Sequence, residues 1–109
     1  MNMNDIKEVK RRIAELREKH HLDPNDESIV NSLIGARIRF VRLIRGKTQT
    51  RVANAIGGTF QHIQKYEKGS NGISTPKLMK ASKYLKFSFK WMFSVFKHKE
   101  VENDETVNK

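Results

Sequence analysis

The sequence contains no cysteine, and its central part has almost no acidic residues. Without cysteine, neither a disulfide framework nor a thiolate metal site can form, which is compatible with a reducing compartment. Between Val30 and Lys97 the one acidic residue is Glu67, so catalysis by a pair of carboxylates has no basis there. No serine, histidine and carboxylate pattern indicates catalysis either. We expect a protein that is not an enzyme and needs no metal or cofactor.

Long apolar runs are also missing. The most aromatic segment, FSFKWMFSVF, is interrupted by Lys90, and a membrane-spanning helix needs roughly 20 apolar residues. The N-terminal sequence MNMNDIKEVKRRIAELREK has charges throughout and no apolar centre of a signal peptide. We therefore expect a soluble, cytoplasmic protein that does not bind membranes.

Positive charge is abundant and is concentrated in the middle of the chain. Residues 1–29 carry six basic and seven acidic side chains, residues 30–97 fourteen and one, and residues 98–109 two and four. The net charges of these segments are −1, +13 and −2, which gives the chain its +10. Like charges at this density repel one another unless a polyanion balances them, so nucleic acid is the expected partner.

Residues 1–27 predict an amphipathic helix followed by a linker. Asn4 or Asp5 is expected to cap a helix that extends to about His20. Four apolar residues recur on one narrow face of this helix: Ile6, Val9, Ile13 and Leu16. Such a seam is too short for a stable coiled coil, so it is expected to dock on the rest of the chain or on a second copy.

Residues 28–97 predict an all-α domain of five short helices. Glycines mark the expected helix ends at Gly46, Gly57, Gly58 and Gly69. The expected N-terminal caps are, in order, Asp26 or Ser28, Thr48, Thr59, Thr75 and Ser88. Residues 98–109 have no apolar face and are expected to form a disordered acidic tail.

The helix expected after Thr59 has two contrasting sides. At about 100° per residue, one side carries the residues expected to point inward: Phe60, Ile63, Tyr66 and Glu67. The opposite side carries Gln61, Gln64, Lys65 and Lys68. Glutamine can bind adenine through two hydrogen bonds, and lysine can donate to guanine or phosphate, so this side suits a major groove. Gln49, at the N-terminus of the preceding helix, is suited to a phosphate.

The segment TQTRVANAIGGTFQHIQKYEKG resembles the helix-turn-helix of phage-repressor-like, Cro/XRE-type transcriptional regulators. Gln49 opens the motif, Ala53 is its small packing residue and Gly57 lies in the turn, while Ile63 and Tyr66 are its inward apolar positions. GARIRFVRLIRGKTQ resembles the first helix of that family, and STPKLMKASKYLKFSFKWMF the fourth and fifth. The resemblance covers about residues 28–96. It implies a compact, five-helix, repressor-like DNA-binding domain, here with an extra N-terminal helix.

The resemblance also implies roles for individual residues. The expected base-contacting residues are Thr59, Phe60, Gln61 and Lys65, with Gln64 as a nearby candidate. The expected DNA-backbone contacts are Arg37, Lys47, Gln49, Arg51, Lys68 and Asn71. Phe60 replaces a residue that is often polar, and it is expected to touch a thymine methyl, to pack beside Ile63, or to do both. Arg42 and Glu67 match a structural ion pair of phage repressors, which would explain a lone carboxylate in a basic segment.

The function expected from these features is sequence-specific binding of double-stranded DNA to regulate transcription, with the protein on the nucleoid when it is bound. The family resemblance implies a homodimer, formed by either the N-terminal helix or the Phe/Trp-rich fifth helix. The main alternative is an antitoxin-like module that binds a partner protein through the N-terminal helix and autoregulates its operon. A weaker alternative is a factor that binds RNA or the transcription machinery.

Overall fold

The computed structural model describes residues 3–20, 25–94 and 96, with side chains omitted at 16–20. The predicted tail at 98–109 and the side chain of Leu16 therefore lie outside the described residues. Within them the secondary structure consists of six helices and no strand, which confirms the predicted all-α fold. None of these helices is long and apolar enough to cross a membrane.

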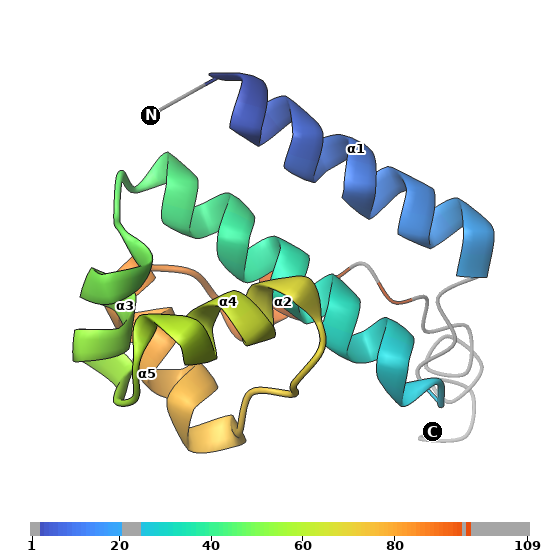
Figure 1. The fold of residues 1–109 in the computed structure, drawn as a ribbon. Helices are drawn as coiled ribbons and strands as arrows, with labels where there is room; N and C mark the ends of the chain where they lie inside the picture. The colour runs from blue at the N-terminus through green and yellow to red at the C-terminus, as the bar shows by residue number, and fades with distance from the viewer. Residues whose placement is uncertain (1–2, 21–24, 95, 97–109) are drawn as a thin grey trace, which may run out of the picture.

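The first two helices, α1 (Met3–His20) and α2 (Glu27–Ile44), form an antiparallel pair (Figure 1). The apolar face of α1 docks on α2, where Val9 is buried and Ile13 packs against Ile29, Leu33 and Phe96. These residues of α1 therefore pack against the rest of the same chain. Because α1 begins at Met3, the prediction that Asn4 or Asp5 precedes the helix as its cap is wrong.

Four shorter helices complete the domain: α3 (Gln49–Ile56), α4 (Phe60–Lys68), α5 (Thr75–Leu85) and α6 (Phe89–Phe93). The cap residues Asp26, Thr48, Thr59 and Ser88 each accept a hydrogen bond from a backbone N–H in the first turn, as predicted. Ser74 rather than Thr75 caps α5, because Thr75 already has helical geometry and Pro76 follows it in the first turn.

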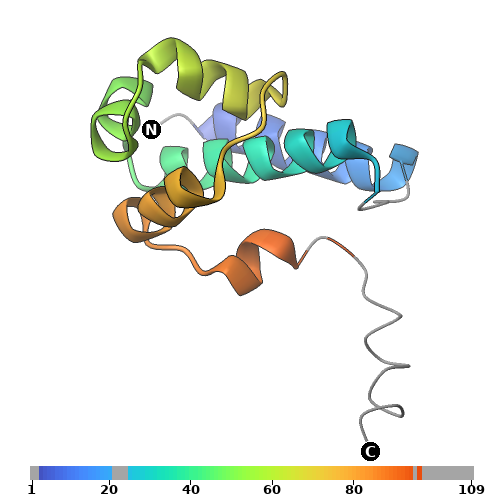
Figure 2. The same ribbon diagram turned by 90° about the horizontal axis from the view of Figure 1, so that it is seen from below.

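Helix α2 lies in the middle of the molecule, with α4 and α6 on opposite sides of it (Figures 1 and 2). The main core joins α2, α3, α4 and α5 through Val41, Val52, Ala53, Ile56, Ile63, Tyr66, Ala81 and Leu85. A second cluster of Ile38, Leu78 and Met92 connects α2, α5 and α6. Because α2 is shared by both clusters, its side chains can fix the position of α4.

Candidate nucleic-acid interface

The turn between α3 and α4 depends on two glycines. Gly57 and Gly58 have φ angles of +94° and +104°, which side-chain-bearing residues rarely adopt. A Cβ atom on Gly58 would also lie 2.8 Å from Nδ1 of His62. This turn sets the angle between the two helices, so the GG pair fixes how α4 is presented.

The N-terminus of α4 is closed by a reciprocal capping box. Thr59 Oγ1 accepts a hydrogen bond from the backbone N–H of His62 at 3.4 Å, and His62 Nδ1 accepts from the backbone N–H of Thr59 at 3.1 Å. The sequence prediction omitted His62, although the Thr-x-x-His spacing is that of a capping box with histidine in the glutamate position. Thr59 therefore lies at the end of α4 with its hydroxyl already engaged.

The first two turns of α4 carry several exposed side chains. Phe60, Gln61 and Lys65 are exposed, and Gln64 is half-buried. Phe60, which the helical wheel places on the inward side and the family resemblance places at the DNA, is 44% exposed. The core residues Ile63 and Tyr66 lie further along the helix, so the first turn projects beyond the core. The result is a short ridge of aromatic, amide and cationic groups.

At the C-terminal end of α4, Glu67 is buried and bound by two side chains. Arg42 donates from Nε to Oε2 at 2.6 Å and from Nη2 to Oε1 at 3.0 Å, in the bidentate arrangement that the sequence suggested. Gln49 Nε2 also donates to Oε1 at 3.1 Å. Glu67 is 3% exposed and Arg42 8%, so the pair is shielded from water. It connects α2 and the start of α3 with the end of α4.

A close backbone approach brings α2 and α4 together at the same place. A Cβ atom on Gly35 would lie 1.9 Å from the carbonyl oxygen of Tyr66. Gly69, at the end of α4, has a φ of +79°, and a Cβ there would lie 2.5 Å from Ser32 Oγ. Only glycine fits at either position, so these two residues allow α4 to rest on α2.

The comparisons with known proteins agree with this geometry. The model of the helix-turn-helix family matches residues 38–92, half of the chain. An uncharacterised HTH-type transcriptional regulator of Sinorhizobium fredii is 42% identical over 64 residues, 59% of this chain and 45% of that protein. An uncharacterised transcriptional regulator in the ATPase CF(0) region of Rhodospirillum rubrum is 32% identical over 91 residues, 84% of this chain and 77% of that protein.

The chain belongs to the Cro/XRE-type helix-turn-helix family. A further regulator of this type, from Rickettsia conorii, is 34% identical over 64 residues, 59% of this chain and 51% of that protein. The chain spans about half the length of most of these curated relatives. No solved structure shows significant similarity.

Within this helix-turn-helix, α4 takes the place of the recognition helix, and the other predicted backbone contacts lie on or just before α3 and at or just after the C-terminal end of α4. Arg51 is exposed in the first turn of α3, and Lys68 and Asn71 are exposed at the C-terminal end of α4. Lys47 is half-buried, with Nζ 5.4 Å from the ring centroid of Tyr84. Gln49 is half-buried and oriented by Glu67. Of these residues, Gln49 and Lys68 line the same hollow as Gln64 of α4.

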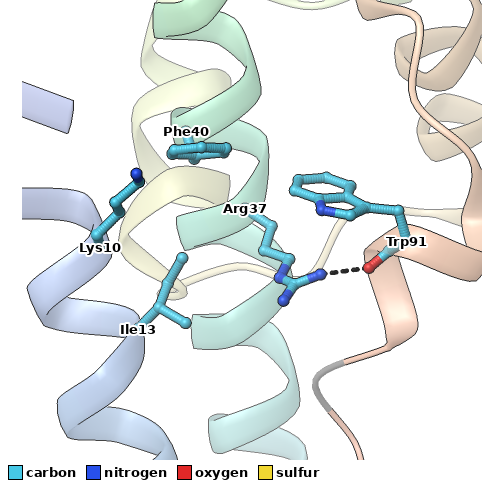
Figure 3. A pocket seen from close by; sticks show the side chains of 5 residues that line it. All are labelled: Lys10, Ile13, Arg37, Phe40 and Trp91. Atoms are coloured by element: carbon cyan, nitrogen blue, oxygen red, sulfur yellow. Dashed lines mark hydrogen bonds between the residues drawn. The ribbon is translucent and has the colours of Figure 1, made fainter. Parts of the chain in front are cut away.

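Arg37 has a different position from the other predicted contacts. It donates to the carbonyl oxygen of Trp91 and to Ser94 Oγ, and its guanidinium lies 4.7 Å from the centroid of the Trp91 ring. In Figure 3 its side chain points toward α6, which lies on the side of α2 opposite the recognition helix. It lines a cavity of about 230 Å³ with Lys10, Ile13, Phe40 and Trp91. We therefore omit Arg37 from the proposed interface.

The sequence prediction missed one cation that contacts the helix-turn-helix from outside it. Arg12, on α1, donates from Nη1 to the carbonyl oxygen of Glu67 at 2.9 Å and from Nη2 to that of Lys68 at 3.0 Å. Partial burial and the nearby charge of Arg39 lower its pKa below the ordinary value, whereas the charge of Glu67 raises it. The guanidinium remains protonated, so α1 places a fixed positive charge against the recognition helix.

Proposed function

We propose that this chain binds specific sites in double-stranded DNA through α4 and thereby regulates transcription. The observation that carries the proposal is the difference between the two parts of α4. Its first two turns have exposed side chains, whereas Glu67 near its C-terminus is buried. Gln61 and Lys65 project from the ridge with hydrogen-bonding groups that match base edges in the major groove. Glu67, held by Arg42 and Gln49, would keep those groups in a constant orientation.

Phe60 is proposed to contact a thymine methyl group. It is one of few large apolar side chains among the described residues that are more than 40% exposed, and it lies next to Gln61 in the first turn of α4. Apolar contact with thymine is a recognised mode of base discrimination. Backbone contacts are proposed for Lys47, Gln49, Arg51, Lys68 and Asn71. Such contacts would fix the protein on the duplex and make affinity depend strongly on salt.

The protein is proposed to act as a homodimer on a near-palindromic site in the cytoplasm, where it would associate with the nucleoid. Val9 and Ile13, the described residues at the centre of the apolar face of α1, already pack within the chain, which argues against that face as the dimer surface. The aromatic side of α6 is the other predicted dimer surface. The same burial argues against the antitoxin-like alternative, which needs that face of α1 for a partner protein.

The decisive experiment is selection of random duplex DNA by the purified protein at two salt concentrations, followed by sequencing. We expect a two-fold motif, and we expect Gln61→Ala to relax it at defined positions. Arg11→Ala, which removes an exposed cation of α1 that pairs with Glu15, is the control and should leave the motif unchanged. Binding without any motif would contradict sequence-specific recognition and would leave a general attraction to polyanions.

A further inference from the structure

The last carbonyl groups of α4 are bound by two different parts of the chain. An α-helix leaves its last four carbonyl groups without partners inside the helix. The carbonyl oxygens of Lys65 and Tyr66 accept from the turn that follows, through the N–H groups of Gly69 and Ser70. Those of Glu67 and Lys68 accept from Arg12. The local turn thus binds one half of the helix end, and a side chain from 55 residues away binds the other.

Arg12 has the chemistry that this position requires. Its planar guanidinium offers donors in a fixed fork, which here span two successive carbonyl groups. A positive charge at a helix C-terminus also interacts favourably with the helix dipole. Arg12 is half-buried, and Val9, one turn earlier on α1, is fully buried against α2. The docking of α1 therefore determines where the guanidinium lies.

The contact joins α4 to a helix that lies outside the family motif. The family match covers residues 38–92, so α1 lies outside it. Arg12 nevertheless binds the backbone of Glu67, whose carboxylate is held by Arg42 and Gln49. Three cationic or amide side chains from three helices thus meet at one residue of α4.

We propose that α1 is a positioning element of the DNA-binding unit, and that Arg12 is the residue through which it fixes the C-terminal end of α4. This proposal rests on the proposed function of α4. It assigns to the N-terminal helix a role in DNA recognition without contact to DNA. Loss of the Arg12 contact should let the end of α4 fray and should change the angle at which Gln61 and Lys65 are presented.

A competing explanation is that Arg12 binds a DNA phosphate directly. It borders a hollow of about 310 Å³ that also contains Arg39, Gln64 and Lys68. In that case a variant without Arg12 would release one counterion fewer when it binds DNA. The magnitude of the slope of log affinity against log salt would then fall by about 0.9. A positioning residue would lower affinity for the preferred site and leave that slope unchanged.

The test uses Arg12→Met in the full chain, which keeps much of the apolar stem and removes the donors. Arg11→Met is the matched control, because Arg11 is the neighbouring arginine and forms only an exposed pair with Glu15 at 3.2 Å. Without DNA, we expect the amides of Gly69 and Ser70 to exchange hydrogen about ten-fold faster in Arg12→Met. In Arg11→Met they should exchange at nearly the parent rate.

Arg12→Met should bind the selected duplex about ten-fold more weakly than the parent protein does. Its affinity for an unrelated duplex should fall only about two-fold. Arg12→Lys should recover part of the protection and affinity, because it restores the charge without the fork. Unchanged amide exchange in Arg12→Met would show that Arg12 does not hold the C-terminal end of α4, whether or not the protein binds DNA. Faster exchange with unchanged specific binding, or a reduced salt slope, would overturn the positioning role. If the parent protein selects no motif, the proposed function fails and the positioning role with it, while the exchange rates still decide the contact.

Discussion

The two ends of α4 are held in different ways. At the C-terminal end Glu67 is buried, and it is bound by Arg42 of α2, Gln49 of α3 and Arg12 of α1. The N-terminal end is exposed and is closed by its own capping box of Thr59 and His62. The contrast separates two tasks along one short helix. The C-terminal end would fix the orientation of the helix, and the N-terminal end would carry the proposed base contacts.

This separation predicts that substitutions at the two ends differ in kind as well as in size. Changes at the buried end should reduce stability and alter recognition as a consequence. Changes at the exposed end should alter recognition while leaving the fold almost as stable as before. The largest effect is expected where a buried charge loses its partner.

Glu67→Ala should lower the free energy of unfolding by about 3–5 kcal/mol, because Arg42 would remain buried without its carboxylate. Chemical denaturation followed by circular dichroism measures this change. Glu15→Ala is the control, since Glu15 pairs with Arg11 at the surface and should contribute less than about 1 kcal/mol. If both variants lose the same small amount, the buried ion pair is no more important than a surface one.

Gly35→Ala should cost about 3 kcal/mol, because the new methyl group would meet the carbonyl oxygen of Tyr66 and push α4 away from α2. Gly46→Ala is a useful contrast. Gly46 has a φ of +67° but open space around it, so alanine there should cost only about 1–2 kcal/mol of backbone strain. Thermal unfolding of both variants should give the lower Tm to Gly35→Ala. The reverse order would mean that the α2–α4 approach can relax easily.

Local features of the sequence predicted most of this fold, and long-range contacts account for what it missed. Caps such as Thr48 and Ser88 were predictable because a hydroxyl before a helical stretch acts on its own first turn. The partnership of Arg42 and Glu67 was suggested by the scarcity of acids and by the family resemblance. Arg12 was not predictable, because its contact depends on how α1 docks on α2, which no local pattern specifies.

The exposure of Phe60 could not be predicted from the helical wheel, for a related reason. A helical wheel assumes that the core extends along the whole helix, and it therefore placed Phe60 on the same side as Ile63. In the structure the first turn of α4 extends past the core, so the same angular position is exposed. The angular position of a residue on the helix was predictable from periodicity. Whether its side chain is buried depends on where the neighbouring helices end.

Thr59→Ala should destabilise the protein by about 1 kcal/mol, since the backbone N–H of His62 would lose its side-chain acceptor and keep only the Thr59 carbonyl oxygen. Thr75→Ala provides a matched control, because Thr75 lies just inside α5 and the cap there is Ser74. That variant should change stability by less than about 0.5 kcal/mol. Equal losses in urea denaturation would show that the capping box does not hold the exposed end of α4.

The smallest effect on stability is expected for Lys68→Ala, which removes an exposed side chain and leaves intact the carbonyl that Arg12 binds. Unfolding should change by less than about 0.5 kcal/mol. Binding should weaken by a similar factor on all duplexes, and the salt slope should fall by about 0.9, because a backbone contact carries no sequence information. Arg11→Ala, which removes an exposed cation of α1, should leave the slope unchanged. A loss confined to the preferred site would instead make Lys68 a base contact, and the part of α4 that reads sequence would then extend to its buried end.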